Sequence, residues 1–147
     1  MEQYLKLVNS FLQEKFYTQL RTTETLGYIV SLLVTQSSGS YCLLGLVQSN
    51  SKTPEFCAER VRTFIKESFK KVKEITDEEF KTHVNSRIVL EKKKDDNLNE
   101  AFLRNWGEIY ENTYKFDKKE KNVQILEKCT KEEFIKFYEK YLINEVS

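Results

Sequence analysis

The sequence predicts an α+β fold in which one antiparallel β-hairpin, part of an incomplete sheet, packs against several helices. Two apolar runs, at about 27–36 and 41–49, flank the polar turn SSGS, which is the pattern of a hairpin. Most of the remaining chain carries apolar residues at three- and four-residue steps, which is the period of amphipathic helices. One proline and four glycines leave few interruptions, as long helices require.

The first predicted helix covers residues 2 to about 21 and leads into the hairpin. Its apolar residues recur at helical spacing: Tyr4, Val8, Phe11, Leu12 and Phe16. In the strand that follows, both alternating faces carry apolar side chains, so we expect both faces of the hairpin to be covered. Two strands of this kind are too few for an independent sheet, so at least one sheet edge is expected to lack its partner in this chain.

Five further helices are predicted, and each has a candidate cap. Thr53 precedes a proline at the first helical position, and TDEE and TKEE are capping boxes that begin at Thr76 and Thr130. Asn99 and Asp117 are expected to cap the two helices between those boxes. The predicted ranges are about 54–74, 76–93, 99–113, 118–128 and 130–142.

These helices supply most of the expected core. Their apolar stripes contain Val61, Phe64, Ile65, Phe69, Val72, Phe80, Val84, Ile88, Phe134, Phe137, Tyr138, Tyr141 and Leu142. Trp106 lies at helical spacing from Leu103 and Tyr110, so it is expected to pack in the core as well.

Composition excludes several classes of protein. A net charge of +1 provides no basic field for nucleic acid, and no run of about 18 apolar residues predicts a membrane-spanning helix. The first residues, MEQYLKLVNSF, lack the apolar core and cleavage site of a signal peptide. Cys42, Cys57 and Cys129 form no CxxC pair, which favours packed thiols in a reducing compartment and a cytoplasmic location.

The chain offers little catalytic chemistry of its own. His83 is the only histidine, so the paired imidazoles of an HExxH or HxxEH zinc helix are missing, and neither a metal site nor a catalytic residue is predicted. The acidic pairs at 78–79 and 132–133 suit the first turns of helices. The mixed charges of EKKKDDN, residues 91–97, are expected to form a solvated loop.

Arg21 and Tyr28 flank the turn between the first helix and the first strand. Their spacing is compatible with two ordinary roles, a cation near a helix C-terminus and an aromatic ring at a strand start. It is also compatible with a guanidinium and a phenol that donate to one acceptor, such as a peptide carbonyl.

The segment LRTTETLGYIV, Leu20 to Val30, resembles the LRTxEQLGYIV signature of the insulysin family of zinc metallopeptidases, with Thr25 where glutamine is usual. Four later segments are similar to that family in order and spacing: GLVQSNSKTPEF, TDEEFKTHV, NWGEIYENTYKFD and CTKEEFIKFYEKYL. The resemblance extends from about Phe16 to Leu142.

The resemblance implies an insulinase-type domain of the LuxS-like metallopeptidase class, the fourth and C-terminal of four α+β domains that close in two bowl-shaped halves. It implies that zinc belongs to the full-length enzyme, bound in an N-terminal domain outside this chain, and that this chain binds none. The signature further implies that Arg21 and Tyr28 hydrogen-bond the peptide substrate, with Tyr17 as an aromatic wall residue where phenylalanine is usual. The implied partners are the remaining domains of the protease and peptide substrates, with a homodimer as a further option.

Three functions are compatible with the sequence. The first is the C-terminal, non-zinc-binding part of an insulysin-like zinc metalloendopeptidase, inactive alone, that closes over peptides and positions them for hydrolysis. The second is a domain of a non-catalytic insulinase-fold subunit with a structural or substrate-gripping role. The third is a free-standing helical binding module, which requires the resemblance over several segments to be accidental.

Overall fold

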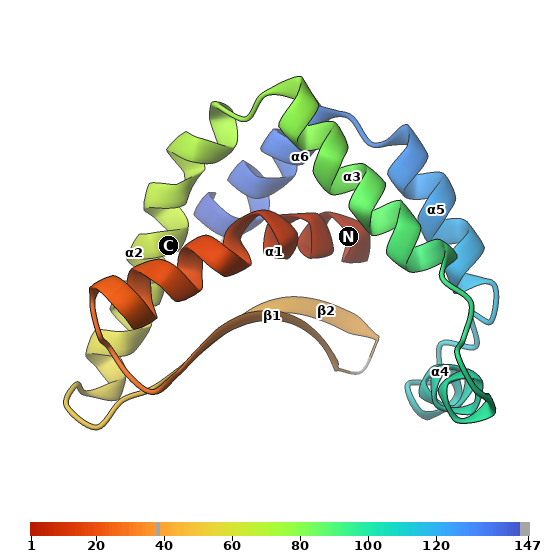
Figure 1. Cartoon of the computed structure of the whole chain (residues 1–147), viewed down its shortest axis with the longest axis horizontal. Coiled ribbons are helices and arrows are strands. Elements are labelled where there is room, and N and C mark those ends of the chain that lie inside the picture. The colour runs from red at the N-terminus through yellow and green to blue at the C-terminus, as the bar shows by residue number, and fades with distance from the viewer. Residues whose placement is uncertain (38, 145–147) are drawn as a thin grey trace.

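The computed structural model describes residues 1–37 and 39–144 and confirms the α+β fold with a two-stranded antiparallel hairpin. The elements in chain order are α1 (Glu2–Tyr17), the π-helix η1 (Thr18–Thr23), β1 (Ile29–Ser37), β2 (Ser40–Gln48), α2 (Pro54–Lys73), α3 (Asp77–Lys92), α4 (Leu98–Tyr110), α5 (Lys118–Lys128), α6 (Lys131–Tyr138) and the π-helix η2 (Glu139–Asn144). Helices α2, α6, α3 and α5 form an arch over α1, and the hairpin lies below α1 (Figure 1). None of the described helices has the length and apolar character needed to cross a membrane.

Helix α1 lies at the centre of the core. Val8, Leu12 and Phe16 on its apolar stripe are fully buried, as the helical spacing predicts. The ring of Phe16 meets that of Phe64 edge-on, with centroids 5.2 Å apart, and this contact joins α1 to α2. The helix thereby covers the inner face of the hairpin, where Val30 and Leu32 of β1 are buried as well.

The outer face of the hairpin is open, which corrects the prediction that both faces are covered. Ile29 pairs with Gln48 in the register, so Ile29, Leu44 and Leu46 share the face opposite α1, and all three are exposed in the described structure. Cys42 lies on the same face and is also exposed, so it is not the packed thiol that was expected. Apolar side chains on both faces allow a strand to be buried on both sides. They do not create the second layer of structure that would cover the outer face.

Local capping chemistry sets the start of most helices. The side chains of Thr53, Thr76 and Thr130 each accept a hydrogen bond from the third backbone N–H of their helix. The reciprocal bond of a capping box forms at Thr130, whereas at Thr76 only the threonine bond is present.

Two predicted caps differ in the structure. Asn97, not Asn99, caps α4, and its Oδ1 accepts the N–H of Glu100 at 3.0 Å. Both asparagines precede the same apolar run, so sequence spacing alone does not separate them. Asp117 precedes α5 but makes no capping hydrogen bond, and its carboxylate instead pairs with Lys121 at 2.7 Å.

Helix α4 turns its apolar side away from the rest of the molecule. It lies apart from the arch, at the lower right of Figure 1. Its exposed apolar residues are Leu98, Phe102, Leu103, Trp106, Ile109 and Tyr110. The prediction that Trp106 packs in the core is wrong, because Trp106 is 50% exposed and its one ring contact among the described residues is a stack on Phe102.

The buried side of α4 is polar. Within this helix only Glu108 is buried, and its carboxylate accepts hydrogen bonds from the Thr113 hydroxyl and from Lys118 Nζ at 3.0 Å. Lys118 also donates to the Tyr41 hydroxyl at 2.6 Å. Charge-assisted hydrogen bonds of this kind are stronger than neutral ones, so α4 is attached by polar contacts and not by apolar burial.

His83 connects α3 to α1, and its burial predicts a pH dependence of the stability of the fold. Its Nδ1 lies 3.2 Å from the Ser10 hydroxyl, and its ring meets Phe11 edge-on. Burial lowers the pKa of His83 from its ordinary value, while the nearby Glu79 opposes this shift and Lys15 adds to it.

Stability is therefore expected to fall in mild acid. An unfolded histidine binds its proton near pH 6.5, whereas the folded one binds it at a lower pH, so the unfolded state gains protons first as the pH drops below about 6.5. Urea unfolding at pH 7.5 and 5.5 should show a smaller loss of unfolding free energy for His83→Gln than for the unsubstituted chain. Equal losses in both proteins would contradict this role.

Candidate functional site

The turn between η1 and β1 brings Arg21 and Tyr28 together. The Arg21 Cζ atom lies 5.3 Å from the centre of the Tyr28 ring, which is a cation–π contact. The side chain of Tyr28 is 80% exposed, whereas Arg21 is half-buried in the widened turn of η1. Isolated π-turns are frequent at functional sites, because they displace a side chain from its regular helical position.

The side-chain donors of Arg21 and Tyr28 have no hydrogen-bond partner within the described part of the chain. Within residues 1–37 and 39–144, the side chain of Arg21 forms no hydrogen bond or ion pair, and its Nε is buried without an acceptor. The Tyr28 hydroxyl likewise has no partner in the described part of the chain. A guanidinium normally forms several hydrogen bonds, so this pair is able to donate to an external acceptor.

Backbone hydrogen bonds are one of the sets of contacts that support the turn. They run from Glu24 N to Gln19 O at 2.9 Å, from Leu26 N to Leu20 O at 3.0 Å and from Tyr28 N to Gln48 O at 3.1 Å. Leu26 is buried between them and anchors the turn in the core. The pair is thus presented by a fixed turn and not by a free loop.

Two residues of the turn have unusual backbone requirements. Gly27 packs so closely on the end of β2 that a Cβ atom there would lie 1.9 Å from the Gln48 carbonyl oxygen. Thr25 has a φ of 50°, a left-handed conformation that is strained for a β-branched residue. Thr25 is also the position where the signature usually has glutamine, which is unbranched at Cβ.

The carboxylate of Glu24 ties the turn to α2, and sequence reasoning missed this contact. Glu24 accepts from Arg60 Nε at 2.7 Å, from Arg60 Nη2 at 2.5 Å and from Gln19 Nε2 at 2.8 Å. The hydrogen bonds from Arg60 hold the pKa of Glu24 below its usual value, with a smaller contribution from Gln19. Glu24 belongs to the signature, but nothing local in the sequence connects it to Arg60.

Tyr17 ends α1 four residues before Arg21, and its side chain is 49% exposed. It borders a shallow groove between α1 and β1 whose other lining residues are Ser10, Gln13, Glu14, Val30 and Ser31. No ring contact joins Tyr17 to Tyr28 among the described residues. The structure therefore brings together two of the three predicted site residues, and the roles of Arg21, Tyr28 and Tyr17 stay predictions.

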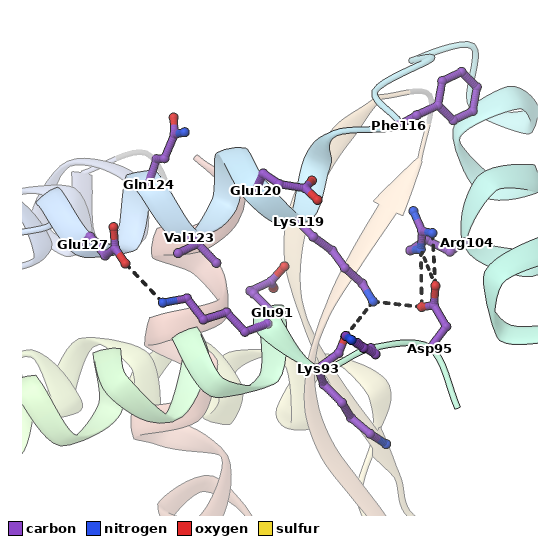
Figure 2. A pocket seen from close by; sticks show the side chains of 12 residues that line it. Glu91, Lys93, Asp95, Arg104, Phe116, Lys119, Glu120, Val123, Gln124 and Glu127 are labelled. Atoms are coloured by element: carbon purple, nitrogen blue, oxygen red, sulfur yellow. Dashed lines mark hydrogen bonds and ion pairs between the residues drawn. The ribbon is translucent and has the colours of Figure 1, made fainter. Parts of the chain in front are cut away.

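A second hollow lies between α3, α4 and α5 and is shown in Figure 2. Asp95 accepts hydrogen bonds from Arg104 and from Lys119 Nζ, the latter at 2.8 Å, so the predicted solvated loop is in fact pinned to α4 and α5. Lys92 pairs with Glu127 at 3.3 Å across the same hollow. Most of its charges thus satisfy one another, and it is a weaker candidate for a ligand site than the Arg21–Tyr28 pair.

No three histidine, cysteine or acidic residues lie together as a candidate metal site in the part of the chain that the structure describes.

Comparison with known proteins gives concordant matches. Residues 7–106 match the family model described as PQQ synthase PqqF-like, C-terminal lobe domain 4. The chain is 35% identical to Insulin-degrading enzyme-like 2 of Arabidopsis thaliana over 142 residues, which cover 97% of the chain and 15% of that protein. It is 32% identical to human Insulin-degrading enzyme over 139 residues, which cover 95% of the chain and 14% of that protein.

The crystal structure of pitrilysin superposes with a TM-score of 0.80 at 26% identity. The match covers 94% of this chain and 15% of the pitrilysin chain. This chain therefore spans about one-seventh of the length of the proteins that it matches.

Proposed function

This chain belongs to the PqqF-like C-terminal lobe domain 4 family, as a C-terminal domain of the insulysin and pitrilysin type, and from this premise we propose that it positions peptide substrates for a zinc metalloendopeptidase. The observation that carries the proposal is the Arg21–Tyr28 pair, whose side-chain donors have no hydrogen-bond partner among the described residues and whose tyrosine is exposed on a hydrogen-bonded turn.

The chemistry of the pair suits a peptide carbonyl. Zinc held by another domain of such an enzyme would polarise the scissile carbonyl and activate the attacking water. Arg21 offers a charged fork of N–H groups, and Tyr28 offers one hydroxyl donor beside it. Donors aimed at the negative charge that develops on a carbonyl oxygen are worth about 3 kcal/mol each in a site from which water is excluded.

The partners in this proposal are the other domains of the same protease and its peptide substrates. We infer that the chain alone is inactive, because its sequence contains no HxxEH zinc motif. The pair acts when the two halves of the enzyme close, because closure brings the donors to the reacting bond and removes water. The homodimer and the cytoplasmic location inferred from the sequence stay predictions.

Complementation tests this function. The purified chain is mixed with the remaining upstream portion of the parent protease, and cleavage of a quenched fluorescent peptide is followed with and without a zinc chelator. Size-exclusion chromatography establishes that the two parts associate. We expect chelator-sensitive cleavage that appears only in the mixture and that falls with Arg21→Ala.

Association without any gain of cleavage would contradict the proposal. It would favour the alternative of a non-catalytic insulinase-fold subunit with a structural or substrate-gripping role.

A further inference from the structure

The hydrogen bonds around Glu24 form a clamp, defined here as Arg60, Glu24 and Gln19. Arg60 of α2 donates to both carboxylate oxygens of Glu24, and Gln19 of η1 donates a third hydrogen bond. Both charged side chains are about one-fifth exposed, so solvent screens the pair less than an exposed salt bridge. A forked arginine–carboxylate contact also fixes the relative orientation of its two partners, which a single contact does not.

The position of the clamp in the chain relates it to the candidate site. Glu24 is the C-cap residue that directly follows η1, and it lies between Arg21 and Tyr28 in the chain. It is followed directly by Thr25, whose left-handed backbone is strained, and then by Gly27 in close contact with β2. A strained turn persists only where its surroundings hold it, and the clamp connects this turn to a long helix.

The clamp adds little to the apolar core. Leu20 and Leu26 on either side of it are buried apolar residues, and the backbone hydrogen bonds of the turn do not involve Arg60. Loss of the clamp should therefore leave the fold in place while it loosens the turn that presents Arg21 and Tyr28. Small displacements of positioning groups cost large factors in rate, because reacting groups must be closely aligned.

We propose that the Arg60–Glu24–Gln19 clamp is a positioning device, which acts through Arg21 and Tyr28 and makes no contact with the substrate. The inference rests on the proposed function of that pair. It assigns roles to Glu24 and Arg60 in peptide hydrolysis and not only in folding.

The test uses the full-length protease that contains this chain. Glu24→Gln retains the shape of the side chain but removes the charge, and it is expected to lower kcat/KM for a quenched fluorescent peptide about 10-fold. Zinc content and the thermal midpoint should stay close to those of the unsubstituted enzyme. In an Arg21→Ala/Tyr28→Phe background the same substitution should change kcat/KM by less than about 2-fold, because both groups through which the clamp acts have then been removed.

Glu67→Gln is the matched control. Glu67 also contacts Arg60, at 3.4 Å, but its side chain is 64% exposed and it lies outside the turn. We expect Glu67→Gln to leave kcat/KM unchanged.

The outcomes separate the two proposals. If Arg21→Ala lowers kcat/KM while Glu24→Gln has no effect, or has its full effect in the Arg21→Ala/Tyr28→Phe background, the clamp is not a positioning device and the proposed function stands. If Arg21→Ala and Tyr28→Phe both leave kcat/KM unchanged, the proposed function of the pair fails and the inference built on it fails too.

Discussion

Tyr28→Phe in the full-length protease is expected to lower kcat/KM for peptide hydrolysis about 100-fold, and Arg21→Ala by at least as much. Phenylalanine keeps the ring that contacts the Arg21 guanidinium, so the variant removes one hydroxyl donor and little else. Because Tyr28 is 80% exposed and its hydroxyl has no partner among the described residues, the fold should be unaffected. Steady-state kinetics with a quenched fluorescent peptide, together with measurement of bound zinc, checks this result.

Tyr17→Phe is the matched control for Tyr28→Phe. It removes the same hydroxyl from a second exposed tyrosine on the same segment, at a position where the signature has phenylalanine. We expect kcat/KM to stay within about 2-fold of the unsubstituted enzyme. Similar losses in both tyrosine variants, or no loss in Tyr28→Phe, would remove the support for a donor role of Tyr28.

Gly27→Ala is expected to destabilise the chain by about 3 kcal/mol or more. The added Cβ would lie 1.9 Å from the Gln48 carbonyl oxygen and 2.6 Å from its carbonyl carbon. These are backbone atoms, so the contact is relieved only if β1 and β2 separate where Tyr28 N donates to that oxygen. Urea unfolding followed by circular dichroism measures the loss.

The chain provides a second glycine for comparison. At Gly107 of α4 an added Cβ would meet nothing within 4 Å. Alanine is the better helix former, so Gly107→Ala is expected to stabilise the helix by up to about 1 kcal/mol. A loss for Gly27→Ala below about 1 kcal/mol, or equal losses at both positions, would show that the close approach to β2 does not constrain this site.

The features that local sequence determines were predictable. The apolar spacing of α1 locates its buried stripe, because a helix brings Val8, Leu12 and Phe16 onto one side whatever packs there. The three threonine caps follow from hydrogen bonds that reach only three residues along the chain. The same spacing was misleading at Trp106, because periodicity identifies an apolar side but not the layer that covers it.

The candidate site was predictable in part for the same reason. Arg21 and Tyr28 flank one short turn, so their proximity follows from the elements on either side. The contact of Glu24 with Arg60 joins residues 36 positions apart, and no periodicity or cap reports such a pairing. The close approach of Gly27 to β2 depends on strand register, which was also not predicted from the sequence.

Helix α4 buries a polar side and exposes an apolar one. Added salt is therefore expected to weaken the attachment of this helix while it strengthens the apolar core. Strongly hydrated salts strengthen apolar burial, which holds α1 against the hairpin. The same salts screen partly exposed charge pairs such as Arg104 with Asp95, which hold α4 in place. A concentrated salt solution thus tightens the core while it frees the helix whose apolar side already faces the solvent.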